Sequence, residues 1–159
     1  MSEEKKDPTL REIYLSLVAP FPADQIHWRV GSTNKDKTQG MALAYLDARN
    51  VMNRLDRTVG PHRWEDDYKE VFGRIVCNLR LNLCGEWVTK SDGAGDTDVE
   101  GQKGGLSDAF KRAAVKFGVG RYLYGLPATW CPIEARGRSF VITKPPTLPV
   151  WALPPVKVQ

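Results

Sequence analysis

Three consecutive segments with a two-residue hydrophobic period limit the folds open to this chain more than any other feature. In residues 74–83, apolar side chains occupy every odd position and polar side chains occupy almost every even position. That alternation predicts a strand with one buried and one exposed face. The dipeptides Phe72-Gly73 and Cys84-Gly85 bound this segment and favour tight hairpin turns. With further strands expected at 64–71 and 86–90, the sequence predicts a three-stranded antiparallel meander.

A basic amphipathic helix is predicted after the meander, over most of residues 106–124. Ser107 is the expected N-cap of this helix. Lys111, Arg112 and Lys116 fall outside its apolar stripe, and like charges four residues apart cost a few tenths of a kcal/mol. A sequence that accepts this cost favours an anion-binding face, with a solvated helix face as the simpler alternative. The apolar stripe recurs at helical spacing and consists of Phe110, Ala113, Ala114 and Phe117.

The N-terminal part of the chain predicts a mixture of helices and strands. Residues 1–8 are charged and are expected to form a disordered tail. A short helix is expected at 10–17 and a short strand at 26–30, followed by a polar loop at 31–40. A longer helix is expected at 41–59, where Gly60-Pro61 would end it. Its candidate core positions are Leu43, Leu46, Val51 and Leu55.

The C-terminal part predicts a small hairpin and an arm. Residues 130–135 and 139–144 flank an Arg-Gly-Arg turn, and residues 145–159 contain five prolines, which favour an extended arm over a helix. The elements together predict an α+β fold: an antiparallel β-β-β-α core with an additional N-terminal helix and a small C-terminal hairpin. One domain is expected to span residues 9–144.

Composition narrows the class of protein. The formal net charge of +4 favours a polyanionic partner such as nucleic acid. No apolar run approaches the length of a membrane span, and the N-terminal SEEKKD has none of the features of a signal peptide. The three cysteines are an odd number without metal-ligand spacing, which favours reduced thiols and a cytoplasmic location.

Motifs for enzymatic chemistry are weak. The glycine-rich segment at 101–104 lacks the pattern of a Walker motif and does not open a GxGxxG unit. His27 and His62 have no His or Cys close in sequence. We therefore expect no catalytic residue, cofactor or metal. A solvated acidic loop is favoured over a weak divalent-ion site, although three acidic residues echo the first half of a calcium loop: Asp96, Asp98 and Glu100.

Basic residues are spread over several predicted elements. If the second long helix packs beside the sheet edge, they would line one groove that neutralises a phosphate backbone without reading bases. Tyr45 or Tyr68 would be near enough to stack on bases. An RNA-binding module is an alternative, and a metal-dependent nuclease built on the acidic loop is a weaker one. The candidate DNA-binding residues are Lys111, Arg112, Lys116, Arg49, Arg74, Arg80 and Lys103, with Arg54 also on the first long helix.

The segment LSDAFKRAAVKFGVGRYLYGLP resembles the signature of the Rad52/Rad22 single-strand annealing family. The preceding elements agree in order: YLDARNVMNRLDRTVGPHRW, the strands through VCNLRLNL, and the glycine-rich turn. The resemblance covers roughly residues 19–127. It implies a β-β-β-α core that assembles into closed homo-oligomeric rings, with single-stranded DNA in a positively charged groove. Duplex DNA is left open as a second ligand.

This resemblance also implies a function and a set of site residues. The function is ATP-independent binding of single-stranded DNA, protection of 3′ ends and annealing of complementary strands. It belongs to DNA repair and recombination at the nucleoid of a bacterial or phage-infected cell. The family's paired basic residues fall on Lys111 and Arg112.

At two further positions where the family has a basic residue, this chain has a different residue. One falls on Val115, beside Lys116, and the other falls near Asn50, beside Arg49.

Overall fold

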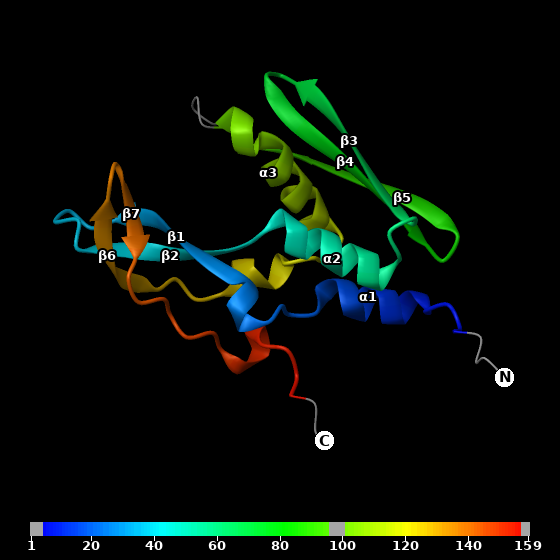
Figure 1. Ribbon diagram of the computed structural model, residues 1–159, viewed down its shortest axis with the longest axis horizontal. Coiled ribbons are helices and arrows are strands. Elements are labelled where there is room, and N and C mark those ends of the chain that lie inside the picture. The colour runs from blue at the N-terminus through cyan, green and yellow to red at the C-terminus, as the bar shows by residue number, and fades with distance from the viewer. Residues whose placement is uncertain (1–4, 96–100, 157–159) are drawn as a thin grey trace. The chain divides into compact units, whose positions relative to one another are not determined.

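The computed structural model describes residues 5–95 and 101–156, with residues 101–103 described by their backbone alone. The chain divides into two compact units, each assembled from two separate stretches of sequence (Figure 1). The meander unit consists of Met1–Ala19 and Ala48–Val119, and the four-strand unit consists of Pro20–Asp47 and Gly120–Gln159. This division differs from the tail, domain and arm expected at 1–8, 9–144 and 145–159, and those boundaries stay predictions.

The predicted meander is confirmed. Its strands are β3 (Trp64–Val71), β4 (Arg74–Leu83) and β5 (Glu86–Gly93), antiparallel in the order β3-β4-β5. Both predicted turns are present as two-residue connections, and all four of their residues have positive φ. Positive φ at both central positions is the requirement of a type I′ turn, whose twist matches that of the flanking strands.

Helix α3 (Gly101–Lys116) covers one face of this sheet. The predicted stripe packs there: Phe110, Ala113 and Ala114 are buried against the fully buried Cys77, Leu79 and Leu81, and Phe117 is half-buried.

The start of α3 differs from the prediction. Because the helix begins at Gly101, Ser107 lies inside it and is not its N-cap. Gly105, near the start of this helix, has a packing role, since a Cβ there would lie 2.7 Å from Ile75 Cδ1.

Two further helices complete the meander unit. The predicted α1 is confirmed at Leu10–Val18, and a capping box between Thr9 and Glu12 fixes its start. Helix α2 (Ala48–Thr58) packs against α1 and α3 and buries Val51 and Leu55.

The four-strand unit holds an antiparallel sheet in the order β1-β2-β6-β7. Its strands are β1 (Ile26–Thr33), β2 (Gln39–Leu46), β6 (Trp130–Arg136) and β7 (Ser139–Ile142). The predicted C-terminal hairpin is confirmed as β6 and β7. The helix predicted at 41–59 is wrong in its first part, because Met41–Leu46 belongs to β2. Met, Ala and Leu are good helix formers, but tertiary context readily overrides helix propensity, and here pairing with β1 and β6 does so.

The remaining segments of this unit are short and irregular. Single turns of 3-10 helix occur at Ala23–Gln25, Arg121–Gly125 and Val150–Ala152. Within the segment predicted as an extended arm, the last of these turns is the one helical departure from extended chain among residues 145–156, and it buries Ala152 completely. No helix in the described part of the chain is long and apolar enough to cross a membrane.

Candidate nucleic-acid interface

The basic residues at the C-terminal half of α3 are tied to the neighbouring strand β5. The Arg112 guanidinium lies 3.6 Å from Asp92 Oδ1. Lys116 donates a hydrogen bond from its ammonium to the carbonyl of Ser91. In return, Lys90 Nζ donates to the Lys116 carbonyl over 3.2 Å and lies 5.4 Å from the centre of the Phe117 ring. These contacts orient the cations along the line where α3 meets β5.

Lys111 occupies another side of α3. It is half-buried, whereas Arg112 and Lys116 are exposed. Ser107 precedes it by one helical turn and faces helix α2, so the helical period places Lys111 toward α2 as well. Arg49 is exposed near the start of α2. The structure therefore brings Arg112, Lys116 and Lys90 together, while Lys111 extends the basic surface around the helix.

Arg74 and Arg80 lie on the opposite face of the sheet from α3. They alternate along β4 with the buried residues that contact the helix. Arg80 pairs there with Glu65. The single groove expected from a helix beside the sheet edge is therefore wrong, because α3 lies across the apolar face. Covering that face removes the most apolar surface from water, which is the dominant favourable contribution to folding.

The two remaining basic candidates are Arg54 and Lys103. Arg54 is only 7% exposed, and it donates hydrogen bonds to the carbonyls of Ser16 and Ala19, so its role is structural. Lys103 lies outside the described side chains. The acidic residues considered for a divalent ion, Asp96, Asp98 and Glu100, lie outside the described residues. Elsewhere in the described chain, no group of three His, Cys, Asp or Glu residues is placed to hold a metal ion.

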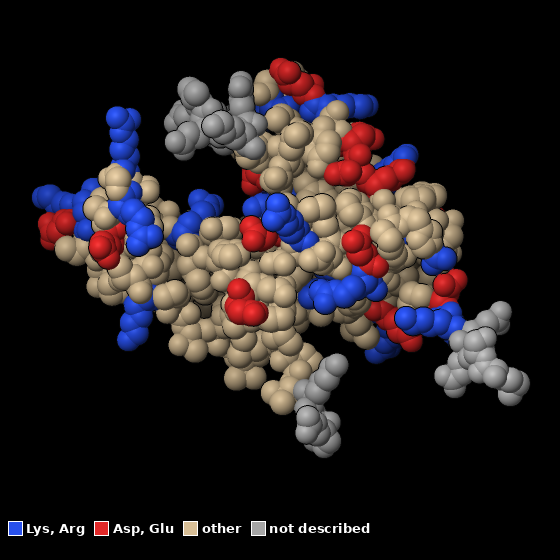
Figure 2. Space-filling model, in the orientation of Figure 1, with Lys and Arg blue, Asp and Glu red and all other residues tan. Residues whose placement is uncertain are grey.

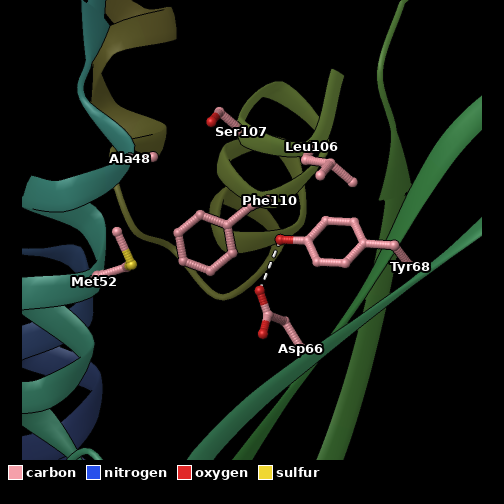
Figure 3. Close-up of a pocket in the computed structure, with 7 residues that line it drawn as sticks. All are labelled: Ala48, Met52, Asp66, Tyr68, Leu106, Ser107 and Phe110. Atoms are coloured by element: carbon pink, nitrogen blue, oxygen red, sulfur yellow. Dashed lines mark hydrogen bonds between the residues drawn. The ribbon is translucent and has the colours of Figure 1, made fainter. Parts of the chain in front are cut away.

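A cavity of about 120 Å³ opens between β3, α2 and the first half of α3. Figure 3 shows Tyr68 and Phe110 converging on it, and the Tyr68 hydroxyl donates a 2.7 Å hydrogen bond to Asp66 Oδ2. Burial raises the pKa of the Tyr68 hydroxyl far above its usual value, and the Asp66 hydrogen bond adds to the effect. The seven lining residues are Ala48, Met52, Asp66, Tyr68, Leu106, Ser107 and Phe110.

The same burial raises the pKa of the Cys77 thiol to about 11. At neutral pH the hydroxyl and the thiol are therefore both protonated and poorly nucleophilic. The base-stacking roles considered for Tyr68 and Tyr45 remain predictions. Tyr68 lines the cavity, and Tyr45 packs 5.4 Å from the ring of His27 in the four-strand unit.

Acidic residues are interspersed with the cations. Figure 2 shows Lys and Arg side chains alternating with Asp and Glu around the β3-β4-β5 sheet. Sequence reasoning missed Lys90, which contacts α3 from β5. Its place in a predicted strand next to the basic helix was the available signal. This arrangement suits a weakly selective contact with phosphates, since separated cations can follow a backbone without reading bases.

Comparison with known proteins supplies an independent finding. The family described as "Rad52/22 family double-strand break repair protein" matches residues 9–138. A relative from Deinococcus deserti named "Single-stranded DNA-binding protein DdrA" is 40% identical over 147 residues, covering 91% of this chain and 72% of that protein. A protein of the same name from Deinococcus radiodurans is 38% identical over 149 residues, covering 91% of this chain and 69% of its own length.

Proposed function

Because the chain belongs to the Rad52/22 family of double-strand break repair proteins, we propose that it binds single-stranded DNA and anneals complementary strands. The proposal includes protection of 3′ ends and needs no ATP. The protein acts in DNA repair in the cytoplasm, at the nucleoid, as a binding protein and not as an enzyme. The observation that carries the proposal is the match over residues 9–138 to this family, together with two relatives named as single-stranded DNA-binding proteins.

The physical requirements of annealing fit the basic surface of α3 and β5. Annealing needs the backbone charge screened while the base edges stay available. Lys111, Arg112 and Lys116 belong to a helix whose other side is anchored in the core, so their positions are restrained before DNA arrives. The ion pair of Arg112 with Asp92 is partly exposed, and phosphate can compete for it because such pairs are weak in water.

We further propose that copies of the chain form a closed ring. A single copy offers few phosphate contacts, and a ring multiplies them through effective concentration. Two features support self-association. The meander has edge strands, β3 and β5, that a neighbouring copy would cover. Helix α1 also has large apolar residues that are 41–51% exposed at four-residue spacing: Leu10, Tyr14 and Val18.

The double variant Lys111→Ala/Arg112→Ala tests the proposed DNA contact. Fluorescence anisotropy with an oligothymidylate measures its affinity at several salt concentrations. Losing two phosphate contacts lowers the salt slope of log K by about 1.4 for single strands and weakens binding at every concentration. The charge-matched control Arg11→Ala/Arg57→Ala changes exposed residues of α1 and α2. Equal affinity and an equal slope for the test and wild-type proteins would exclude this site.

Two further measurements complete the test. Duplex DNA and RNA of matched length, used as competitors, separate single-stranded DNA binding from the other nucleic-acid ligands. Light scattering with and without DNA measures assembly, and a monomer under both conditions contradicts the ring.

A further inference from the structure

The turn between β3 and β4 holds a side chain that the meander does not need. Phe72 occupies its first position with φ of +51°, followed by Gly73 with φ of +75°. Type I′ turns favour Asn, Asp or Gly there, because a Cβ is unfavourable at positive φ. The Phe72 side chain is also completely exposed (101%). An aromatic residue thus occupies a strained position from which it contributes no buried surface to this fold, and strain of this kind marks candidate functional positions.

The surroundings of Phe72 are cationic on one face of the sheet. The pairs Val71–Arg74 and Lys69–Val76 fall on the face opposite α3, because Cys77 and Leu79 fill the α3 side. Val71, Lys69 and Arg74 are all exposed. We call these three residues and Phe72 the hairpin tip.

Two described acidic residues lie next to the hairpin tip in register, Glu70 and Asp67. Glu70 pairs in register with Ile75, which belongs to the α3 face. Among the described residues, Asp67 is the next acid on the tip's own face, and it accepts a 2.7 Å hydrogen bond from Asn78 Nδ2. The hairpin tip thus places the exposed Phe72 ring beside Lys69 and Arg74.

We propose that Phe72 stacks on a nucleobase of single-stranded DNA while Lys69 and Arg74 contact the adjacent phosphates. This inference rests on the proposed function and adds a second contact, on the opposite face of the sheet from α3. Aromatic stacking and backbone cations are the combination by which proteins hold single strands without sequence preference. Single strands fit better than duplex DNA, in which neighbouring base pairs already cover the base faces.

The variant Phe72→Asn separates binding from folding. Asn suits the turn better than Phe, so the variant unfolds at the same temperature as wild type or higher. Its affinity for an oligothymidylate falls about fivefold or more, the range for losing one stacked base. Its affinity for an abasic strand of equal length is unchanged, because that strand has no base to stack. Phe72→Trp retains wild-type affinity for both strands.

Cys84→Asn is the matched control. Cys84 has φ of +54° at the equivalent position of the β4–β5 turn, at the other end of β4. It undergoes the same change of turn chemistry away from the hairpin tip, so its affinity for both strands stays at the wild-type value.

Several outcomes would overturn the inference. An unchanged affinity of Phe72→Asn for oligothymidylate excludes stacking, and an equal loss on the abasic strand shows that the base is not the partner. If Phe72→Asn has a lower mass than wild type by light scattering, Phe72 docks instead on a second copy of the chain. If wild type co-sediments with vesicles of anionic phospholipid and Phe72→Asn does not, a membrane is the partner. If the wild-type chain binds neither strand, the proposed function itself fails; if wild type and Phe72→Asn bind alike, only this inference fails.

Discussion

Replacing Arg54 by Met removes the donor that completes the end of helix α1. In an α-helix the Ser16 carbonyl would accept from the N–H of residue 20, but Pro20 has no N–H. Arg54 replaces that donor from helix α2: its Nη1 lies 2.9 Å from the Ser16 carbonyl oxygen and 2.6 Å from that of Ala19. No basic residue of α1 itself lies in its last turn. The Arg54 charge therefore also complements the negative end of the helix dipole.

The expected loss follows from these two contacts. A hydrogen bond to a charged group contributes about 1.5–3 kcal/mol when both partners are buried. Arg54 is 7% exposed, so solvent screens its contacts little. Met keeps much of the apolar stem and removes both bonds, and we expect a loss of about 3–5 kcal/mol in the free energy of unfolding. That loss is a large share of the roughly 5–15 kcal/mol that stabilises a typical domain.

Urea denaturation followed by circular dichroism measures this loss. Arg54→Lys keeps the charge with a single donor group and should recover part of the stability. Arg57→Met changes an exposed residue of the same helix and should stay within about 0.5 kcal/mol of wild type. If Arg54→Met lies within about 1 kcal/mol of wild type, the two bonds do not hold the end of α1, and the reasoning fails.

Two further predictions concern backbone strain and pH. Gly118→Ala should destabilise the protein by about 2 kcal/mol or more, because Gly118 has φ of +98° and an added Cβ would lie 2.6 Å from Val18 Cγ1. Gly73 also has positive φ, but an added Cβ there would have no other atom within 4 Å. The difference between the urea midpoints of Gly118→Ala and Gly73→Ala therefore measures the effect of the contact with Val18. Stability should also fall by about 1 kcal/mol on raising the pH from 8 to 10. The fold raises the pKa of Cys77 from 9.0 to about 11, so the unfolded chain loses its proton first. The stabilisation that comes from the raised pKa of Cys77 is complete below pH 9 and is lost as the pH rises through 11. Urea midpoints at the two pH values measure the fall, which should shrink in Cys77→Ala and persist in Cys84→Ala; an equal fall in Cys77→Ala would contradict the assignment.

The elements predicted most accurately are those whose structure depends on residues close together in the sequence. The bounds of β3 and β4 were predicted correctly, because a two-residue period and adjacent turn residues determine them locally. The apolar stripe of α3 was also predicted, because the helical spacing of its residues is a local pattern. The prediction failed at Met41–Leu46, which pairs with Ile26–Val30 and, at Met41, with Trp130. The pairing with Trp130 joins residues distant in sequence, and no local pattern reports it.

The candidate site divides in the same way. Periodicity alone assigned Lys111, Arg112 and Lys116 to positions outside the apolar stripe of α3. The sequence also grouped Arg54 with the exposed basic residues, although its side chain donates hydrogen bonds to carbonyls at the end of helix α1.

The meander, the basic helix and the resemblance to an annealing family all follow from local sequence patterns. Which cations share a surface depends on how the helices pack on the sheet. Because α3 lies across the apolar face of the sheet and not beside its edge, strand alternation directs Arg74 and Arg80 away from Lys111 and Arg112. Their separation depends on where the helix packs, and that choice is made by contacts between elements that no local pattern contains.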